Sequence, residues 1–247
     1  MSTPKFIHLP ETESTNQSLR ILTDAGALPN FSVLWADYQT KGRGQAGSSW
    51  ESAPGENLLC SIVFYPARLP ANRSFSVLET AALSVKSTLE TYATDITIKW
   101  PNDIYCRDKK ICGILIENEI VAGCITRSII GIGININQTA FKGDAPNPVS
   151  LAMITGKEYD RQEILNQLLK NFQLHANKID TGDIEDLHLQ YCASLYRRDG
   201  FHVYKDAQGF FTARFFAVEP FGHLILERKD GTLSRYAFKE VEAIITN

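Results

Sequence analysis

The sequence predicts an α+β protein in which helices flank a mixed, largely antiparallel sheet and a small β-barrel follows at the C-terminal end. Helical and strand patterns of apolar residues alternate as far as about residue 196. From residue 197, short strand patterns follow one another with glycine-containing turns between them, which is typical of a small barrel. We therefore predict a large domain over residues 1–196 and a small β domain over residues 197–247.

The predicted elements follow from the spacing of apolar residues. Intervals of three and four predict helices over 14–22, 75–92, 160–176 and 183–196. We expect Ser14 or Thr15 to cap the first helix, and Ser76 and Glu79 have the spacing of a capping box for the second. Apolar runs and alternation predict strands over 31–39, 58–65, 96–100, 111–119, 120–127, 129–137, 201–204, 210–218, 223–228, 234–238 and 241–245.

Charge and cysteine content exclude several protein classes. The formal net charge is −3, so the chain has no general electrostatic attraction for nucleic acid. Its five cysteines are an odd number without metal-ligand spacing, which favours free thiols in a reducing compartment. The sequence has no signal-peptide pattern and no apolar run of about 18 residues. We expect a cytoplasmic protein that binds neither nucleic acid nor membranes.

Three segments carry residues suited to anion chemistry. The even positions from Ile130 to Ile136 are all isoleucine while the odd ones are small or polar, which predicts a strand with one bare, ligand-facing side or a poorly packed edge strand. Gly42–Gly47 can turn backbone N–H groups and Arg43 toward an anion, although on local grounds a flexible surface loop is favoured. Lys99–Asp103 can aim a carboxylate at magnesium and an amide at a nucleotide, with a solvated turn equally favoured.

Taken in order, five motifs of the sequence resemble the successive motifs of biotin protein ligases. They are Glu13–Asn16, Gln39–Gly44 with Trp50–Ser52, Lys99–Asp103, Lys110–Leu115 and Gly131–Asn135. The resemblance covers about residues 6–137, and the remainder matches only in kind, as helices followed by a small SH3-like domain. It implies a class II synthetase-like core that converts biotin into biotinyl-AMP with ATP. The biotinyl group then passes to a lysine of a biotin carboxyl carrier protein.

The resemblance also implies roles for single residues. The implied biotin pocket consists of Ser14, Thr15, Asn16, Gln39, Gly42, Arg43, Gly44, Lys110, Gly113, Gly131 and Gly133. The implied ATP contacts are Arg43, Trp50, Lys99, Asn102 and Asn135, and Asp103 is the implied magnesium ligand. Arg43 and Lys110 are the implied catalytic residues. ATP with magnesium and biotin enter as substrates, and no tightly bound prosthetic group is implied.

Elementary chemistry agrees with these roles. Adenylation drives the carboxylate of biotin against the α-phosphate of ATP, so cations must offset the repulsion between two anions. The available charges are Arg43, Lys99, Lys110 and magnesium. In a partly desolvated site, each cation stabilises the transition state by on the order of a few kcal/mol.

Two features depart from the family pattern. Many relatives carry arginine where this chain has Gln45 and a basic residue where it has Ser48, so we expect retention of the adenylate to depend more on Arg43. The Ser14 motif follows the first residue closely, so we expect a monofunctional ligase without the DNA-binding domain of some relatives. By the same resemblance, a homodimer would form through the strand near 131–137.

Two other functions stay open at this point. A lipoate or octanoyl protein ligase shares the core and the acceptor lysine, and motif spacing does not set specificity for the biotin ring. A non-catalytic biotin-binding sensor would keep the pocket. The cations and Asp103 speak against the sensor, because binding alone needs no magnesium carboxylate.

Overall fold

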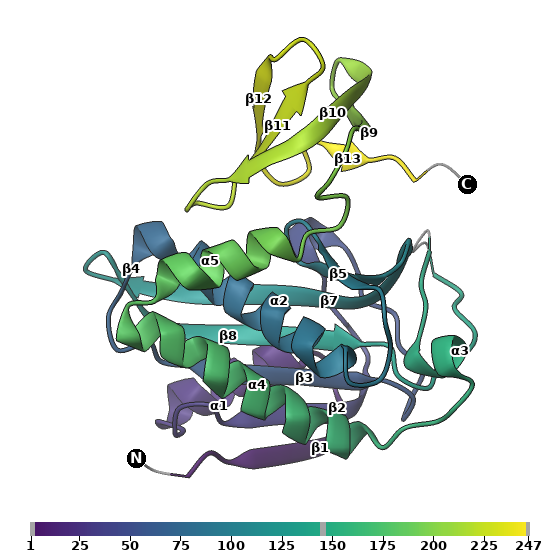
Figure 1. Ribbon diagram of the computed structural model, residues 1–247. Helices are drawn as coiled ribbons and strands as arrows, with labels where there is room; N and C mark the ends of the chain where they lie inside the picture. The colour runs from purple at the N-terminus through teal and green to yellow at the C-terminus, as the bar shows by residue number, and fades with distance from the viewer. Residues whose placement is uncertain (1–2, 144–146, 246–247) are drawn as a thin grey trace.

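The computed structural model describes residues 3–143 and 147–245 (Figure 1). Its largest element is an eight-stranded sheet built from β1 (Phe6–Thr12), β2 (Val33–Gln39), β3 (Leu58–Phe64), β4 (Leu69–Pro70), β5 (Ile96–Lys99), β6 (Asp103–Cys106), β7 (Lys109–Val121) and β8 (Cys124–Ile134). The order is β1-β2-β3-β8-β7-β6-β5, with β4 also paired to β8. β1 and β2 are parallel and the other neighbours antiparallel, so the predicted mixed sheet is confirmed.

Helices cover both faces of this sheet (Figure 1). One face carries α2 (Phe75–Leu89), α4 (Arg161–Thr181) and α5 (Ile184–Ala193), and the other carries α1 (Thr15–Ala25). Short α3 (Leu151–Thr155) and the 3-10 turns η1 (Gln45–Gly47) and η2 (Ala71–Arg73) lie in connections. The carboxylate of Asp160 caps α4 by accepting the N–H of Gln162 at 2.7 Å. Within the described ranges, no helix is long and apolar enough to cross a membrane.

β8 occupies the middle of the sheet, between β3 and β7. Ile130, Ile132, Ile134 and Ile136 are buried in the core beneath α2, as their alternation predicts. The alternative of a poorly packed edge strand is therefore wrong. Both edges of β8 pair with neighbouring strands of the same chain, and the expected homodimer stays a prediction.

Three local predictions need correction. The strand predicted over 120–127 is wrong, because the chain reverses at Ala122 and Gly123, both with positive φ, so that β7 and β8 form a hairpin. The apolar residues on both sides of this turn conceal it in the sequence. The predicted capping box is also wrong, since α2 begins after Ser74 and Glu79 is buried inside it, with its carboxylate on His188. Strands β1, β4 and β6 were not predicted.

The chain after α5 forms a five-stranded antiparallel sheet. Its strands are β9 (His202–Asp206), β10 (Gly209–Val218), β11 (Leu224–Arg228), β12 (Leu233–Tyr236) and β13 (Glu242–Ala243). The order is β12-β11-β10-β9-β13, so all five predicted strands are confirmed. The structure establishes this sheet but not a closed barrel, and the domain boundary at residue 197 stays our proposal.

A few specific contacts join the C-terminal sheet to the large domain. The indole N–H of Trp100 donates to the carbonyl of Gly222 at 2.9 Å, and the ring of Phe238 meets Trp100 edge-on with centroids 6.5 Å apart. Gly222 lies against Phe75 so closely that an added Cβ would be 2.3 Å from the Phe75 ring. These contacts set the position of the C-terminal sheet over one end of the large one.

We expect Gly222→Ala to weaken this contact. Gly222 has a φ of 88°, and Gly231, in the turn after β11, has a φ of 85° with no described atom within 4 Å of an added methyl group. Both alanines carry the left-handed penalty of about 1–2 kcal/mol, but only the one at 222 collides with Phe75. Calorimetry should give a lower Tm for Gly222→Ala than for Gly231→Ala. Equal losses of Tm would contradict the role of Gly222 in joining the two sheets.

Candidate functional site

A cavity of about 520 Å³ lies between the glycine-bearing face of the large sheet and the C-terminal sheet. Most of the sequence-predicted site residues line it, namely Ser14, Thr15, Asn16, Gln39, Arg43, Gly44, Trp50, Lys99, Asn102, Asp103, Lys110, Gly113, Gly131 and Gly133. The tertiary structure therefore brings four distant segments and the N-terminus of α1 to one place.

A chain of polar groups closes one end of the cavity. Gln39 Oε1 accepts the backbone N–H of Thr15 at 2.8 Å and its hydroxyl at 3.0 Å, and Ser61 Oγ lies 2.8 Å from the Thr15 hydroxyl. Ser14 occupies the N-cap position of α1, but its side chain makes no capping hydrogen bond to the described backbone. The plain N-cap interpretation of Ser14 is therefore wrong for its hydroxyl, which is buried at the cavity wall.

Asn16 continues this polar chain toward the glycine loop. Its Oδ1 lies 2.6 Å from Ser61 Oγ, and its Nδ2 donates to Glu117 Oε2 at 3.0 Å. Gly131 is required here, because an added Cβ would lie 2.4 Å from Asn16 Oδ1. The other oxygen of Glu117 is 3.4 Å from Arg43 Nη2. Glu117 thus holds two of the predicted residues together.

Sequence reasoning missed Ser61 and Glu117. Ser61 is a buried hydroxyl in the otherwise apolar strand β3, and Glu117 is an acidic residue in the half-buried middle of β7. A polar residue in a buried strand was the available signal for Ser61. For Glu117 the sequence carries none, because its partners lie 74 and 101 residues away.

The glycine loop is a short hairpin. The N–H of Trp50 donates to the Gly42 carbonyl at 3.0 Å, the N–H of Gly44 donates to the Ser48 carbonyl at 2.6 Å, and Arg43 bridges to Ser49. An added Cβ at Gly42 would lie 2.5 Å from the Trp50 carbonyl oxygen. Gly42 is absent from the cavity lining among the described residues and closes the hairpin, and its expected ligand contact stays a prediction.

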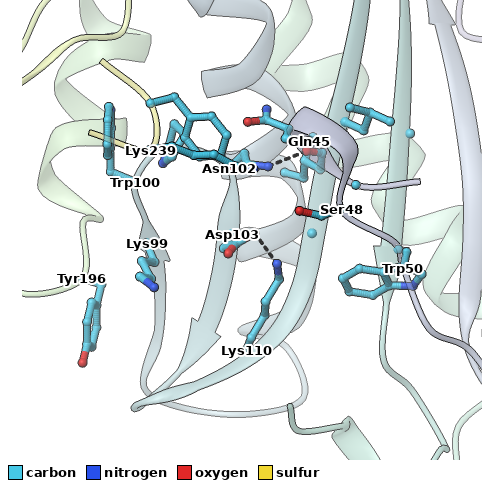
Figure 2. Close-up of a pocket in the computed structure, with 18 of the residues that line it drawn as sticks. Gln45, Ser48, Trp50, Lys99, Trp100, Asn102, Asp103, Lys110, Tyr196 and Lys239 are labelled. Atoms are coloured by element: carbon cyan, nitrogen blue, oxygen red, sulfur yellow. Dashed lines mark hydrogen bonds and ion pairs between the residues drawn. The ribbon is translucent and has the colours of Figure 1, made fainter. Parts of the chain in front are cut away.

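Three glycines, Gly113, Gly131 and Gly133, leave a strip of the sheet without side chains, which we call the bare strip. Trp50 ends the hairpin, and its indole lies on this strip. Gly113 and Gly133 face each other across β7 and β8, and an added Cβ would meet the indole at 2.8 and 2.6 Å respectively. The indole Nε1 is buried and has no hydrogen-bond partner among the described residues. Figure 2 shows Trp50 on the opposite side of Lys110 from Lys99. Trp50 lines the cavity, and the nucleotide contact expected for it stays a prediction.

Lys110 and Asp103 form an ion pair in the middle of the cavity (Figure 2). Lys110 Nζ is 2.7 Å from Asp103 Oδ1, and the side chains are 27% and 22% exposed. Lys110 Nζ also lies 5.6 Å from the centre of the Trp50 ring. The partial burial strengthens the field of the lysine, since water screens it less than at the surface. The pair with Asp103 therefore holds Lys110 in one place beside the bare strip.

The nucleotide end of the expected site contains Lys99 and two tyrosines. Lys99 Nζ donates to the hydroxyl of Tyr105 at 3.1 Å. Burial and the hydrogen bond to Asp108 raise the pKa of Tyr196 to about 12, so its phenol stays protonated at neutral pH. Lys99 and Tyr196 both line the cavity, with Phe238 and Lys239 of the C-terminal sheet. Sequence reasoning missed these C-terminal residues.

The two predicted asparagines differ in position. Asn102 is buried at the cavity wall, and its Nδ2 donates to the Ile114 carbonyl at 2.7 Å. Asn135 is absent from the described lining, and its Nδ2 donates to the Val149 carbonyl at 3.1 Å. Asn135 holds the segment before α3 in this structure, and its expected ATP contact stays a prediction.

The side chains available as metal ligands determine which kind of magnesium site the cavity can form. The described residues contain no group of three or more histidine, cysteine, aspartate or glutamate side chains that could hold a metal ion. Magnesium that arrives with a nucleotide needs only one or two protein carboxylates, because phosphates and water supply the other ligands. Asp103 in the cavity fits such a substrate-borne ion and does not fit a resident metal centre.

Comparisons with known proteins agree with this site. A model of the biotin/lipoate A/B protein ligase family matches residues 9–135. A biotin--[acetyl-CoA-carboxylase] ligase of Paracoccus denitrificans is 31% identical over 184 residues, which cover 70% of this chain and 73% of that protein. The bifunctional ligase/repressor BirA of Bacillus spizizenii is 28% identical over 238 residues, covering 94% of this chain and 72% of that protein.

A solved structure shares the fold over nearly the whole chain. A biotin protein ligase from Aquifex aeolicus, in complex with biotin and ATP, has a TM-score of 0.76 and 24% identity, covering 98% of this chain and 100% of that one.

Proposed function

Because the chain belongs to the biotin/lipoate A/B protein ligase family, we propose that it adenylates biotin with ATP and transfers the biotinyl group to a carrier lysine. The observation that carries the proposal is the Lys110–Asp103 pair at the centre of a cavity lined by residues of all five motifs. We assign the acceptor lysine to a biotin carboxyl carrier domain, since the name of the Paracoccus denitrificans relative gives acetyl-CoA-carboxylase as its acceptor.

Binding of biotin uses the polar end of the cavity. Its ureido ring needs both donors and acceptors, and Ser14, Thr15, Asn16 and Gln39 offer hydroxyl and amide groups there. The valeryl chain then runs beside Trp50, whose indole lies over Gly113 and Gly133. This path brings the carboxylate to Lys110.

Adenylation joins the biotin carboxylate to the α-phosphate of ATP. A carboxylate oxygen attacks phosphorus, the P–O bond to pyrophosphate breaks, and pyrophosphate leaves with the electron pair. Lys110 carries three donors, so it can keep Asp103 and still reach the carboxylate and a phosphate oxygen. Lys99 and Arg43 add charge at the two sides of this centre, and Asp103 would hold the magnesium that ATP brings.

Transfer follows without a protein nucleophile. The carrier lysine attacks the carbonyl carbon of biotinyl-AMP, the amide bond forms, and AMP leaves with the electrons of the C–O bond. Gln45 and Ser48 line the cavity, so the less cationic positions of the hairpin face the intermediate. We assign retention of the biotinyl-AMP intermediate to Arg43, the cation of this hairpin.

The five free cysteines support a reducing, cytoplasmic setting. We propose no interface for a homodimer.

The decisive experiment is mass spectrometry of a carrier domain incubated with the protein, ATP, magnesium and biotin. We expect the mass increase of one biotinyl group, and none when the acceptor lysine is replaced. Parallel titrations with biotin and lipoate separate the family's two ligand classes. Modification by lipoate without modification by biotin would refute the biotin assignment, and biotin binding without pyrophosphate exchange would indicate a sensor.

We expect Lys110→Ala to abolish adenylation while leaving the fold intact. Removing the ammonium removes the cation that meets both anions, which costs about 100-fold or more in pyrophosphate exchange. Lys109→Ala is the matched control, because Lys109 is the exposed neighbour at the start of the same strand. Exchange should be unchanged in the control, and both variants should unfold within a few degrees of the parent protein. A parallel loss of Tm and exchange in Lys110→Ala would refute its catalytic role.

Glu117→Gln should raise the KM for biotin, because Glu117 positions Asn16 and Arg43 together. A hydrogen bond to a charged group contributes about 1.5–3 kcal/mol, so we expect an increase in KM of roughly tenfold or more. Glu119→Gln serves as the control, since Glu119 lies two residues further along β7 and pairs with Arg127 at 2.8 Å. Steady-state exchange assays that show the same KM for both variants would contradict the positioning role.

A further inference from the structure

Outside the cavity, a thiol, an imidazole and a carboxylate lie in line where α5 packs on α2. Cys192 Sγ is 3.6 Å from His188 Nε2, one helical turn earlier on α5. On the other side of the ring, His188 Nδ1 is 2.6 Å from Glu79 Oε1 of α2. The order of groups is that of a nucleophile, a base and a carboxylate that orients the base.

Burial decides the charges of this cluster. Glu79 is only 2% exposed, and this burial raises the pKa of its carboxyl group while the His188 cation opposes the rise. The hydrogen bonds to Cys192 and to Glu79 raise the pKa of His188 to about 10. Two other charged groups lie near Glu79, Arg73 beside α2 and Glu185 of α5. They form an ion pair with each other at 3.0 Å. At neutral pH the ring is therefore an imidazolium facing the thiol.

None of the other four cysteines, Cys106 included, has a histidine or carboxylate hydrogen-bonded to it among the described residues. Cys60 and Cys112 are fully buried, and burial raises the pKa of both thiols, that of Cys60 to about 12. Cys124, at the start of β8, is half-buried like Cys192 but has no histidine or carboxylate hydrogen-bonded to it among the described residues. Cys124 therefore serves as an internal reference for the reactivity of Cys192.

We propose that Cys192 is a modification site, a sulfur nucleophile beside the His188 cation that reacts with soft electrophiles. As the thiol proton leaves to water, the sulfur uses its lone pair to form a bond to the electrophilic carbon. With an alkyl halide, the S–C bond forms as the C–halogen bond breaks, and halide leaves. A thiolate beside an imidazolium reacts at a pH where an ordinary thiol is protonated.

The same site is coupled to the ligand cavity. α5 ends one residue after Cys192, and the chain continues directly into Leu195 and Tyr196, which line the cavity. The hydroxyl of Tyr191 donates to the Pro101 carbonyl at 2.7 Å, inside the Lys99–Asp103 motif. An adduct on Cys192 displaces this end of α5, so we expect it to lower adenylation. This coupling rests on the proposed function, whereas the reactivity of the thiol does not.

Iodoacetamide and peptide mass spectrometry test the reactivity in the full chain between pH 5 and 8. The measured rate at Cys124 is the reference within the same protein. At pH 6, Cys192 should react at least about tenfold faster than Cys124. Equal rates at the two cysteines would overturn the proposal.

Two variants assign the effect to its partners. His188→Asn should bring the rate and pH profile of Cys192 to those of Cys124, and Glu79→Gln should lower the rate while keeping the ring in place. An unchanged Cys192 profile in folded His188→Asn overturns the proposal. If a variant does not fold, the comparison of Cys192 with Cys124 in the parent protein still decides.

Pyrophosphate exchange tests the coupling separately. Iodoacetamide should lower exchange in the parent protein and spare Cys192→Ser, which we expect to have the parent's basal activity. Rapid alkylation of Cys192 with unchanged exchange overturns the coupling. Absence of exchange before alkylation refutes the proposed function and leaves the thiol measurement valid.

Discussion

Gly113 and Gly133 oppose each other on β7 and β8, and the site depends on the missing side chains of this pair. A methyl group at either position would lie within 2.8 Å of the Trp50 indole. A third glycine, Gly131, gives the same room to Asn16. Glycine weakens a strand because it packs nothing and loses more conformational freedom on folding. The isoleucines on the opposite face offset that weakness, since all of them are buried beneath α2.

The bare strip also determines the surroundings of the Lys110 ammonium group. With Trp50 flat on the sheet, Lys110 lies between an aromatic face and the carboxylate of Asp103. A lysine in a partly desolvated cavity needs such partners, because an unpaired buried charge is costly. The same arrangement restricts its side chain before any ligand arrives. The site therefore presents an ordered cation to an incoming carboxylate, and the ordering cost is met during folding.

The C-terminal sheet completes what the large sheet begins. Its contribution to the cavity wall comes from residues such as Phe238 and Lys239, and Trp100 reaches across to the Gly222 carbonyl. The Lys99–Asp103 motif thus has two functions in the fold, since Trp100 joins the sheets while its neighbours face the cavity. Tyr191 adds a second hydrogen bond to this motif from α5. The C-terminal sheet and α5 therefore both hold the Lys99–Asp103 motif in position.

The sequence by itself determined the features that depend on local spacing. Isoleucine at every second position predicted which face of β8 is buried, apolar intervals predicted the four longer helices, and glycine turns predicted the five C-terminal strands. Only the tertiary structure decided the rest. Glu117 reaches Arg43 and Asn16 across 74 and 101 residues, Ser61 meets Asn16 across 45, and the Ala122–Gly123 turn is concealed between apolar residues. Such partners are chosen by the register of strands far apart in the chain, and no local pattern encodes that register.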